Sequence, residues 1–220
     1  MNIVERVDDR VRIRHALVSV SDKTGLDVLI PGLIDANPDV QITSTGGTYA
    51  AIARILGAEG TAQHLRQVAD YTGQPETQGG LVKIYLGVLT ETYNPSHQAD
   101  LARTGAVRLD MVVVNLYPFE ATVARQGVTV EEARATIDIG GPCMMRAAAK
   151  NYLRVAAVVD PADYGGVVAS LRAHEGCLDL ETRFELARKA FARTAAYDRA
   201  ISEYLAGQDV GTVPSTYTLA

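Results

Sequence analysis

The chain has 220 residues, of which 47% are apolar and 21% charged, and its 21 basic and 26 acidic side chains give a net charge of −5. This length suits one domain of about 150 to 200 residues with a modest addition. The sequence lacks the ~18 uninterrupted apolar residues of a membrane helix and, at its N-terminus, the apolar core of a secretory signal. Mild acidity without runs of Lys or Arg does not favour nucleic acid or a membrane surface as partner. We therefore expect a soluble, cytoplasmic protein.

No motif for a metal or a cofactor is present. The two cysteines, Cys143 and Cys177, lack the CxxC spacing of a zinc or redox site. Neither a Walker A loop nor a GxGxxG segment occurs. The prediction is a protein that needs no metal and no cofactor.

Strand and helix patterns alternate along the chain. Strands are predicted at residues 14–20, 40–43, 65–68, 110–116 and 155–159. The strongest is 110–116, whose continuous apolar residues are typical of a parallel strand covered on both faces. Helical patterns follow these strands, and Pro31 with Gly32 is expected to kink or shorten the first helix, which ends at Ala36. The last pattern, residues 180–205, places Phe184 and Phe191 on its apolar stripe. At roughly 39 Å it is expected to bend or break.

This alternation predicts an α/β protein with a mostly parallel sheet, flanking helices and a helical C-terminal addition. We expect one domain over residues 14–206. Its α/β core covers about 14–160 and its helical extension about 161–206. Residues 207–220 read as a tail.

Polar residues follow two of the predicted strands. Ligands of open α/β sheets bind at the carboxyl ends of the strands. Here these ends lead into helix N-termini, which favour an anion. The pattern describes a phosphate pocket, although plain turns remain the alternative. Its residues are Ser19, Ser21, Lys23 and Thr24 after the first strand, and Thr45, Gly46, Gly47 and Thr48 after the second.

Two further segments carry candidate chemistry. Asn115 and Tyr117 leave the strongest strand, where they can enter the same cleft or simply form a turn. Asp138 precedes a helix start at Gly140, and Lys150 closes that helix. A carboxylate and an ammonium in one cleft form a proton-handling pair; otherwise they are a helix-dipole acid and a C-terminal cation.

Lysine usage adds a separate observation. The chain has 17 arginines but only four lysines, and lysine differs from arginine in being compact and able to lose its proton. Lys23, Lys83 and Lys150 fall in loop-like or glycine-flanked segments, whereas Lys189 reads as a surface residue. The alternative is that the few lysines occur at these positions by chance and have no special role.

Five collinear segments of the chain closely resemble the inosine monophosphate cyclohydrolase domain, which usually forms the N-terminal part of a bifunctional formyltransferase and cyclohydrolase of purine synthesis. The resemblance extends from about residue 14 to 206 and implies a methylglyoxal-synthase-like α/β fold. The segments are VSDKTG at 20–25, STGGT at 44–48, NLYPF at 115–119, DIGGP at 138–142 and RAAAKN at 146–151.

The resemblance implies ring closure of 5-formamidoimidazole-4-carboxamide ribonucleotide to inosine monophosphate with loss of water. It implies that Asp138 and Lys150 activate the carboxamide, that Tyr117 donates to the formyl oxygen, and that Lys83 stabilises the oxyanion. Asn115 and Gly140 would face the base of this purine nucleotide monophosphate precursor. The residues that would hold its 5′-phosphate are Ser19, Ser21, Lys23, Thr45, Gly46, Gly47 and Thr48.

The chain departs from the family in two places. Family members read Gly-Arg-Val-Lys-Thr-Leu-His-Pro around the lysine that matches Lys83, but here Lys83 is followed directly by Ile84. Either the loop is shorter or residues are omitted from the chain, and omission is the favoured explanation because a deletion would damage the site. The formyltransferase domain has no counterpart, so a separate formyltransferase is expected to supply the substrate.

Two other functions remain open. One is a non-catalytic purine-nucleotide-binding module, which the changed segment at Lys83 allows. The other is another methylglyoxal-synthase-like sugar-phosphate lyase, although all four histidines lie outside the motifs. The oligomeric state, including a homodimer, is also left open by the sequence.

Overall fold

The computed structural model describes residues 3–73 and 81–218 and contains a main sheet of five parallel strands. All five coincide within a residue or two with the predicted strands, which confirms the parallel α/β class. In sheet order the strands are β4 (Leu65–Gln67), β3 (Gln41–Ser44), β2 (His15–Val20), β5 (Met111–Asn115) and β6 (Ala156–Val158). The two most apolar strands, β5 and β6, are typical of parallel strands covered on both faces.

The chain fills this sheet outward from β2 in two directions. It first adds β3 and β4 on one side and then β5 and β6 on the other. Val18 lies opposite Ser44 of β3, and Val20 lies opposite Asn115 of β5. The carboxyl ends of these three strands therefore meet at one edge, at the switch point between β2 and β5 where ligands of open α/β sheets bind.

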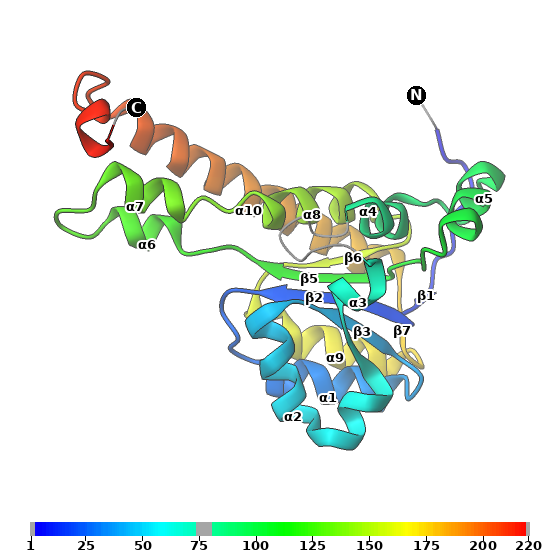
Figure 1. The fold of residues 1–220 in the computed structure, drawn as a ribbon. Helices are drawn as coiled ribbons and strands as arrows, with labels where there is room; N and C mark the ends of the chain where they lie inside the picture. Colours follow the sequence, from blue (N-terminus) through cyan, green and yellow to red (C-terminus); the bar gives the residue numbers. More distant parts are fainter. Residues whose placement is uncertain (1–2, 74–80, 219–220) are drawn as a thin grey trace.

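Three helices cover one face of the sheet (Figure 1): α1 (Leu26–Ala36), α2 (Gly46–His64) and α9 (Tyr164–Ala173). The expected shortening of α1 at Pro31 is wrong, since the helix continues to Ala36. Packing is the reason. A Cβ at Gly32 would lie 2.5 Å from a methyl of Val168 on α9, so the close approach of the two helices holds this segment helical.

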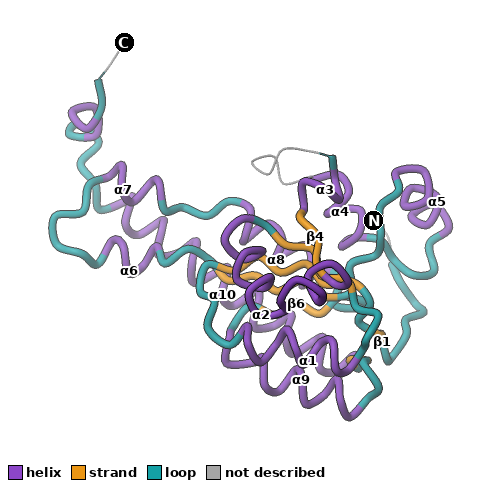
Figure 2. The backbone as a smooth tube through the Cα atoms, turned by 60° about the horizontal axis from the view of Figure 1, so that its bottom comes forward, coloured by secondary structure: helices purple, strands orange, loops and turns teal. Residues whose placement is uncertain are grey.

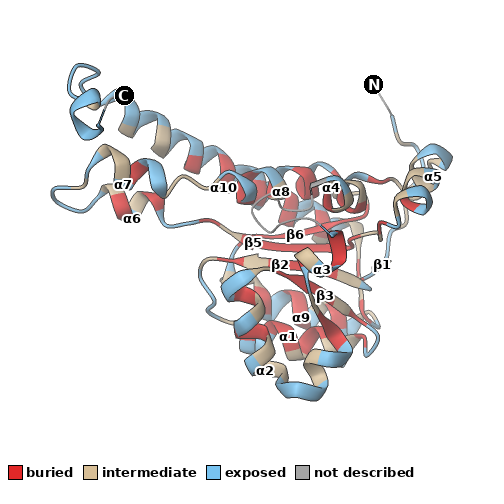
Figure 3. Ribbon diagram, viewed as in Figure 1, coloured by how far each residue is buried: buried red, intermediate tan, exposed pale blue. Residues whose placement is uncertain are grey.

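The other face is covered by α4 (Leu81–Leu89), α8 (Gly140–Lys150) and α10 (Leu180–Ala206). Alternate strand residues such as Leu17 and Val112 point into this layer. Figure 3 shows buried residues concentrated where the helices of both layers meet the sheet. The long helix thus forms part of the main core.

The structure corrects two expectations for α10. The helix is unbroken over 27 residues. Its buried stripe also differs from the predicted one, because Phe184 and Phe191 are 45% and 39% exposed while Arg183 is fully buried. The Arg183 guanidinium donates to carbonyls of Asp8, Asp9, Tyr152, Leu153 and Leu178. An arginine is thus the residue that docks this end of the helix.

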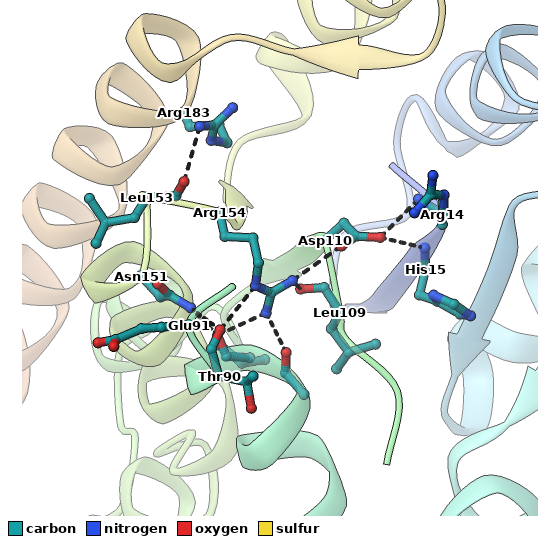
Figure 4. Close-up of polar contacts among 12 residues, drawn as sticks. Arg14, His15, Thr90, Glu91, Leu109, Asp110, Asn151, Leu153, Arg154 and Arg183 are labelled. Carbon is teal, nitrogen blue, oxygen red and sulfur yellow. Dashed lines mark hydrogen bonds and ion pairs between the residues drawn. The ribbon is translucent and has the colours of Figure 1, made fainter. Parts of the chain in front are cut away.

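A second buried arginine joins the sheet to its surroundings (Figure 4). Arg154, 4% exposed, forms an ion pair with Asp110 at 3.1 Å and donates to the carbonyls of Gly87, Thr90 and Leu109. The same Asp110 carboxylate accepts from the main-chain N–H groups of Arg14 and His15. This network connects the segment before β2, the segment before β5 and the end of α4.

A two-helix arm, α6 (Phe119–Val123) and α7 (Val130–Ala135), extends from the body beside the C-terminal half of α10 (Figures 1 and 2). Thr129 and Glu132 form a capping box at the start of α7. The short helix η3 (Val213–Thr216) follows α10, and Tyr217 donates to Glu131 at 2.8 Å. Part of the predicted tail is therefore held against the arm.

The remaining elements are short and were not predicted. They are the antiparallel pair β1 (Val11–Arg12) and β7 (Cys177–Leu178), and the helices α3 (Val68–Thr72), α5 (Pro95–Thr104) and η2 (Pro161–Asp163).

Within residues 3–73 and 81–218, no helix is both long enough and apolar enough to cross a bilayer.

Candidate functional site

The carboxyl ends of β2, β3 and β5 open onto a cavity of about 720 Å³. This volume is within the range of roughly 300 to 1,000 Å³ found for small-molecule sites. Eleven of the thirteen site residues implied by the resemblance line it: Ser19, Ser21, Lys23, Thr45, Gly46, Gly47, Thr48, Asn115, Tyr117, Asp138 and Gly140.

Hydroxyls and a helix start form the part of the cavity between β2 and β3. The hydroxyls of Ser19 and Thr45 lie 3.0 Å apart. Gly46 begins α2 with a φ of 42°, in the region that favours glycine. The first N–H groups of a helix have no partner within the helix, and together with the helix dipole they attract an anion.

The ammonium of Lys23 lies beside the same helix start. Its Nζ is 3.9 Å from the position that a Cβ of Gly47 would occupy. It donates to the carbonyls of Val20 and Ser21 at 3.2 and 3.1 Å. These bonds fold the lysine back over its own loop and keep its charge at the cavity.

Two side chains that were predicted to contact the ligand instead form hydrogen bonds within the protein. The buried Thr48 hydroxyl donates to the Val20 carbonyl at 2.9 Å and accepts from its N–H at 3.1 Å. The Asn115 carboxamide accepts from the N–H groups of Ser21 and Asp22 and donates to the Asp22 carbonyl. Both side chains therefore shape the loop after β2 while they line the cavity.

Asp138 stands at the start of α8. Its Oδ1 accepts from the Gly141 N–H at 2.8 Å. A Cβ at Gly141 would lie 2.5 Å from the Oδ2 of Asp138 and 2.7 Å from the side chain of Leu116. Only glycine leaves room for the carboxylate in this position.

The rest of the lining is a phenol and an apolar wall. The side chain of Tyr117 is 52% exposed at the cavity. The wall residues were not predicted, because apolar residues on a strand or helix look like ordinary core in a sequence. They are Leu17, Val68, Ile84, Val114, Ile139 and Met144.

The two other predicted site residues, Lys83 and Lys150, are both described by the structure and lie outside this cavity. Lys83 donates to the Tyr71 carbonyl at 3.4 Å, and its ammonium is 5.6 Å from the centre of the Tyr71 ring. Lys150 ends α8 with an exposed side chain and borders a separate hollow against α10. Since α8 has 11 residues that rise about 1.5 Å each, it separates Lys150 from Asp138 by about 15 Å. The expected Asp138–Lys150 pair in one cleft is absent within the described chain.

The segment around Lys83 is continuous. Lys83 and Ile84 are successive residues of α4, so the chain passes between them within one helix. The glycine pair before Leu81 lies outside the described residues.

Fold and site together define an open, parallel α/β domain with a cavity at its topological switch point. The family model of the MGS-like domain matches residues 29–143, and that of the AICARFT/IMPCHase bienzyme matches residues 148–220. The chain belongs to the MGS-like domain family, as the sequence motifs predicted.

Two known proteins illustrate this relationship. The chain is 50% identical over 217 residues to the bifunctional purine biosynthesis protein PurH of Magnetococcus marinus, covering 94% of this chain and 39% of PurH. The crystal structure of ForH matches with a TM-score of 0.75 and 30% identity, covering 89% of this chain and all of ForH. The chain thus spans well under half the length of its PurH relative.

Proposed function

We propose that this protein closes the second ring of a purine nucleotide, converting 5-formamidoimidazole-4-carboxamide ribonucleotide to inosine monophosphate with loss of water. One observation carries the proposal: the anion-binding hydroxyls, Lys23, Tyr117 and Asp138 all line the same cavity. The similarity to PurH and to the bienzyme family model supports the choice of substrate.

The chemistry requires a proton acceptor and a stabiliser of negative charge. The carboxamide nitrogen attacks the formyl carbon, a C–N bond forms, and the nitrogen loses a proton. The formyl oxygen takes the electron pair and is protonated. Its C–O bond then breaks and it leaves as water, while the formamido nitrogen loses its proton and forms the C=N bond of the new ring. Both reacting groups belong to one imidazole ring, so holding the formyl group toward the amide lowers the barrier. The ring closure needs no oxidant and no second reactant.

In this proposal Asp138 accepts the amide proton and Tyr117 donates to the developing oxyanion. The hydrogen bond from Gly141 fixes the acid at the helix start. Ser19, Thr45 and the first N–H groups of α2 hold the phosphate. Lys83 would have to leave Tyr71 to take part, and Lys150, which lies outside the cavity, is given no step in this proposal.

The deciding experiment is a spectroscopic assay with synthetic formylated nucleotide, followed by the appearance of purine absorbance. We expect turnover by the wild type and a loss of about 10² to 10⁴ in kcat for Asp138→Asn, because an amide cannot accept the proton. Lys83→Ala should lose less than about tenfold, since its ammonium is directed at Tyr71.

Asp179→Asn is the matched control. Asp179 caps α10 through the Thr182 N–H, far from the cavity lining, and asparagine caps a helix equally well. Wild-type kcat in this variant shows that the loss is specific to position 138. Equal turnover by the wild type and by Asp138→Asn would exclude the proposed proton acceptor.

A second candidate function is nucleotide binding without ring closure. The placement of Lys83 and Lys150 outside the cavity favours it, because the site then has fewer cations for the chemistry. Titration calorimetry with inosine monophosphate separates the two. Binding by a wild type that shows no turnover supports the binding module, whereas binding together with turnover supports the enzyme.

The proposed reaction also has consequences for partners and location. Its substrate carries a formyl group, so a formyl-transfer activity must act before it, and we propose a separate formyltransferase in the cytoplasm as its source. Addition of unformylated nucleotide and a formyl donor to the purified protein should give no product until a formyltransferase is added.

A further inference from the structure

Asp138 is held from a part of the chain far away in sequence. The preceding residues connect α7 to α8, and a buried tyrosine of α10 lies against this connection. The main-chain N–H of Asp138 donates to the hydroxyl of Tyr197 at 2.9 Å. The same hydroxyl donates to the Thr136 carbonyl at 3.2 Å. One phenol therefore bonds both sides of the residue that precedes the acid.

The ring that carries this hydroxyl is immobilised by packing. Tyr197 has no exposed surface. Its ring meets Phe119 edge to face, with centroids 6.0 Å apart, and the Arg193 guanidinium lies 5.7 Å from its centre. Burial raises the pKa of Tyr197, so at neutral pH the phenol keeps the proton that it donates to Thr136.

Two hydrogen bonds hold Asp138 at the same time. The Gly141 N–H holds its carboxylate, and the Tyr197 hydroxyl holds its main chain. A proton acceptor must lie within hydrogen-bond reach of the proton it removes, and a displacement of about 1 Å can cost about a hundredfold in rate. Fixing both ends of a short acidic side chain leaves little freedom for such a displacement.

We propose that Tyr197 is a positioning residue for the reaction, acting through the main chain of Asp138. The inference rests on the proposed function and deepens it. It gives α10 a role in catalysis although the helix lies beyond residues 29–143, the part that matches the MGS-like domain model. The cavity of that domain thus depends on a helix added after it.

The test compares two tyrosines of the same helix. Tyr197→Phe removes one hydroxyl and keeps the packed ring. Tyr204→Phe makes the same change two turns further along, on a ring that also meets Phe119 edge to face, at 5.9 Å. The Tyr204 hydroxyl contacts the Thr129 carbonyl at 3.5 Å and has no bond to the Asp138 connection. The two substitutions therefore differ chiefly in that the Tyr197 hydroxyl contacts Asp138 and the Tyr204 hydroxyl does not.

We expect Tyr197→Phe to lower kcat by about ten- to a hundredfold while KM and the Kd for inosine monophosphate change by less than about twofold. Tyr204→Phe should keep wild-type kcat. In amide NMR, the Asp138 N–H should shift and exchange faster with solvent in Tyr197→Phe alone. Thermal unfolding of both variants shows whether the fold is retained.

Each outcome decides the inference. Equal kcat in the two variants, or an unchanged Asp138 amide, overturns it and leaves the proposed function standing. A parallel loss of kcat, substrate affinity and thermal stability in Tyr197→Phe overturns it as well, because that pattern is purely structural. A wild type that closes no ring removes the proposed function, and this inference with it.

Discussion

At the scale of single residues, the two glycines at the start of α8 face opposite requirements. Gly141 is buried against Asp138 and Leu116, and any Cβ there would overlap the carboxylate. A Cβ at Gly140 would meet no atom within 4 Å. The glycine pair that looks uniform in the sequence therefore contains one sterically required position and one open position.

We expect Gly141→Ala to destabilise the protein by about 1 to 3 kcal/mol, the usual cost of overpacking. Gly140→Ala should be neutral or stabilising by up to about 1 kcal/mol, because alanine is the better helix former. Urea unfolding of both variants provides the measurement. Equal free energies of unfolding would mean that the carboxylate moves aside without cost.

At the scale of elements, the arm is attached to α10 by an ion pair. Arg193 of α10 donates to the carboxylate of Glu120 on α6 at 2.6 Å. This bond lowers the pKa of Glu120 below its ordinary value of 4.5. A depressed acid pKa means that the folded state binds the proton less readily than the unfolded state. The pair therefore stabilises the protein above pH 4.5, and this contribution is lost as the pH falls through the folded-state pKa.

The expected size of this contribution is below about 1 kcal/mol, since both partners are more than one-third exposed and solvent screens them. Thermal unfolding of the wild type and of Glu120→Gln should differ slightly at neutral pH. The two Tm values should converge at pH values well below 4.5, where the wild-type carboxylate is also neutral. A constant difference across this range would show that the charge of Glu120 is not responsible.

At the scale of the whole molecule, Arg154 joins three segments that are distant in sequence. Burial lowers the pKa of its guanidinium to about 10, which leaves it charged at neutral pH beside Asp110. Breaking a buried ion pair leaves one charge without its partner and typically costs about 3 to 5 kcal/mol. Arg154→Met should therefore lower the free energy of unfolding by about that amount.

An exposed ion pair gives the control for this prediction. Arg172 and Asp35 are paired at 3.0 Å, but both are more than half exposed. Arg172→Met should cost less than about 1 kcal/mol. Urea denaturation of the two variants should differ by at least about 2 kcal/mol, and a smaller difference would show that Asp110 is adequately held by the N–H groups of Arg14 and His15 alone.

Local patterns were enough to predict the strands and the loops that follow them. Apolar residues marked β2, β3 and most strongly β5, and the polar residues after these strands lie together because the carboxyl ends of parallel strands meet at one edge. The predicted shortening of α1 at Pro31 was wrong, because the packing of Gly32 against α9 outweighs the local preference of proline.

The amino-acid sequence by itself determined the family, the parallel sheet and most of the cavity lining, because these depend on short motifs and on the period of apolar residues. Only the tertiary structure decided where the lysines and the long helix lie. Lys150 is carried away from Asp138 by the length of α8, while Tyr197 reaches Asp138 across 59 residues. Contacts between distant segments depend on how helices pack in space, and no local pattern records that packing.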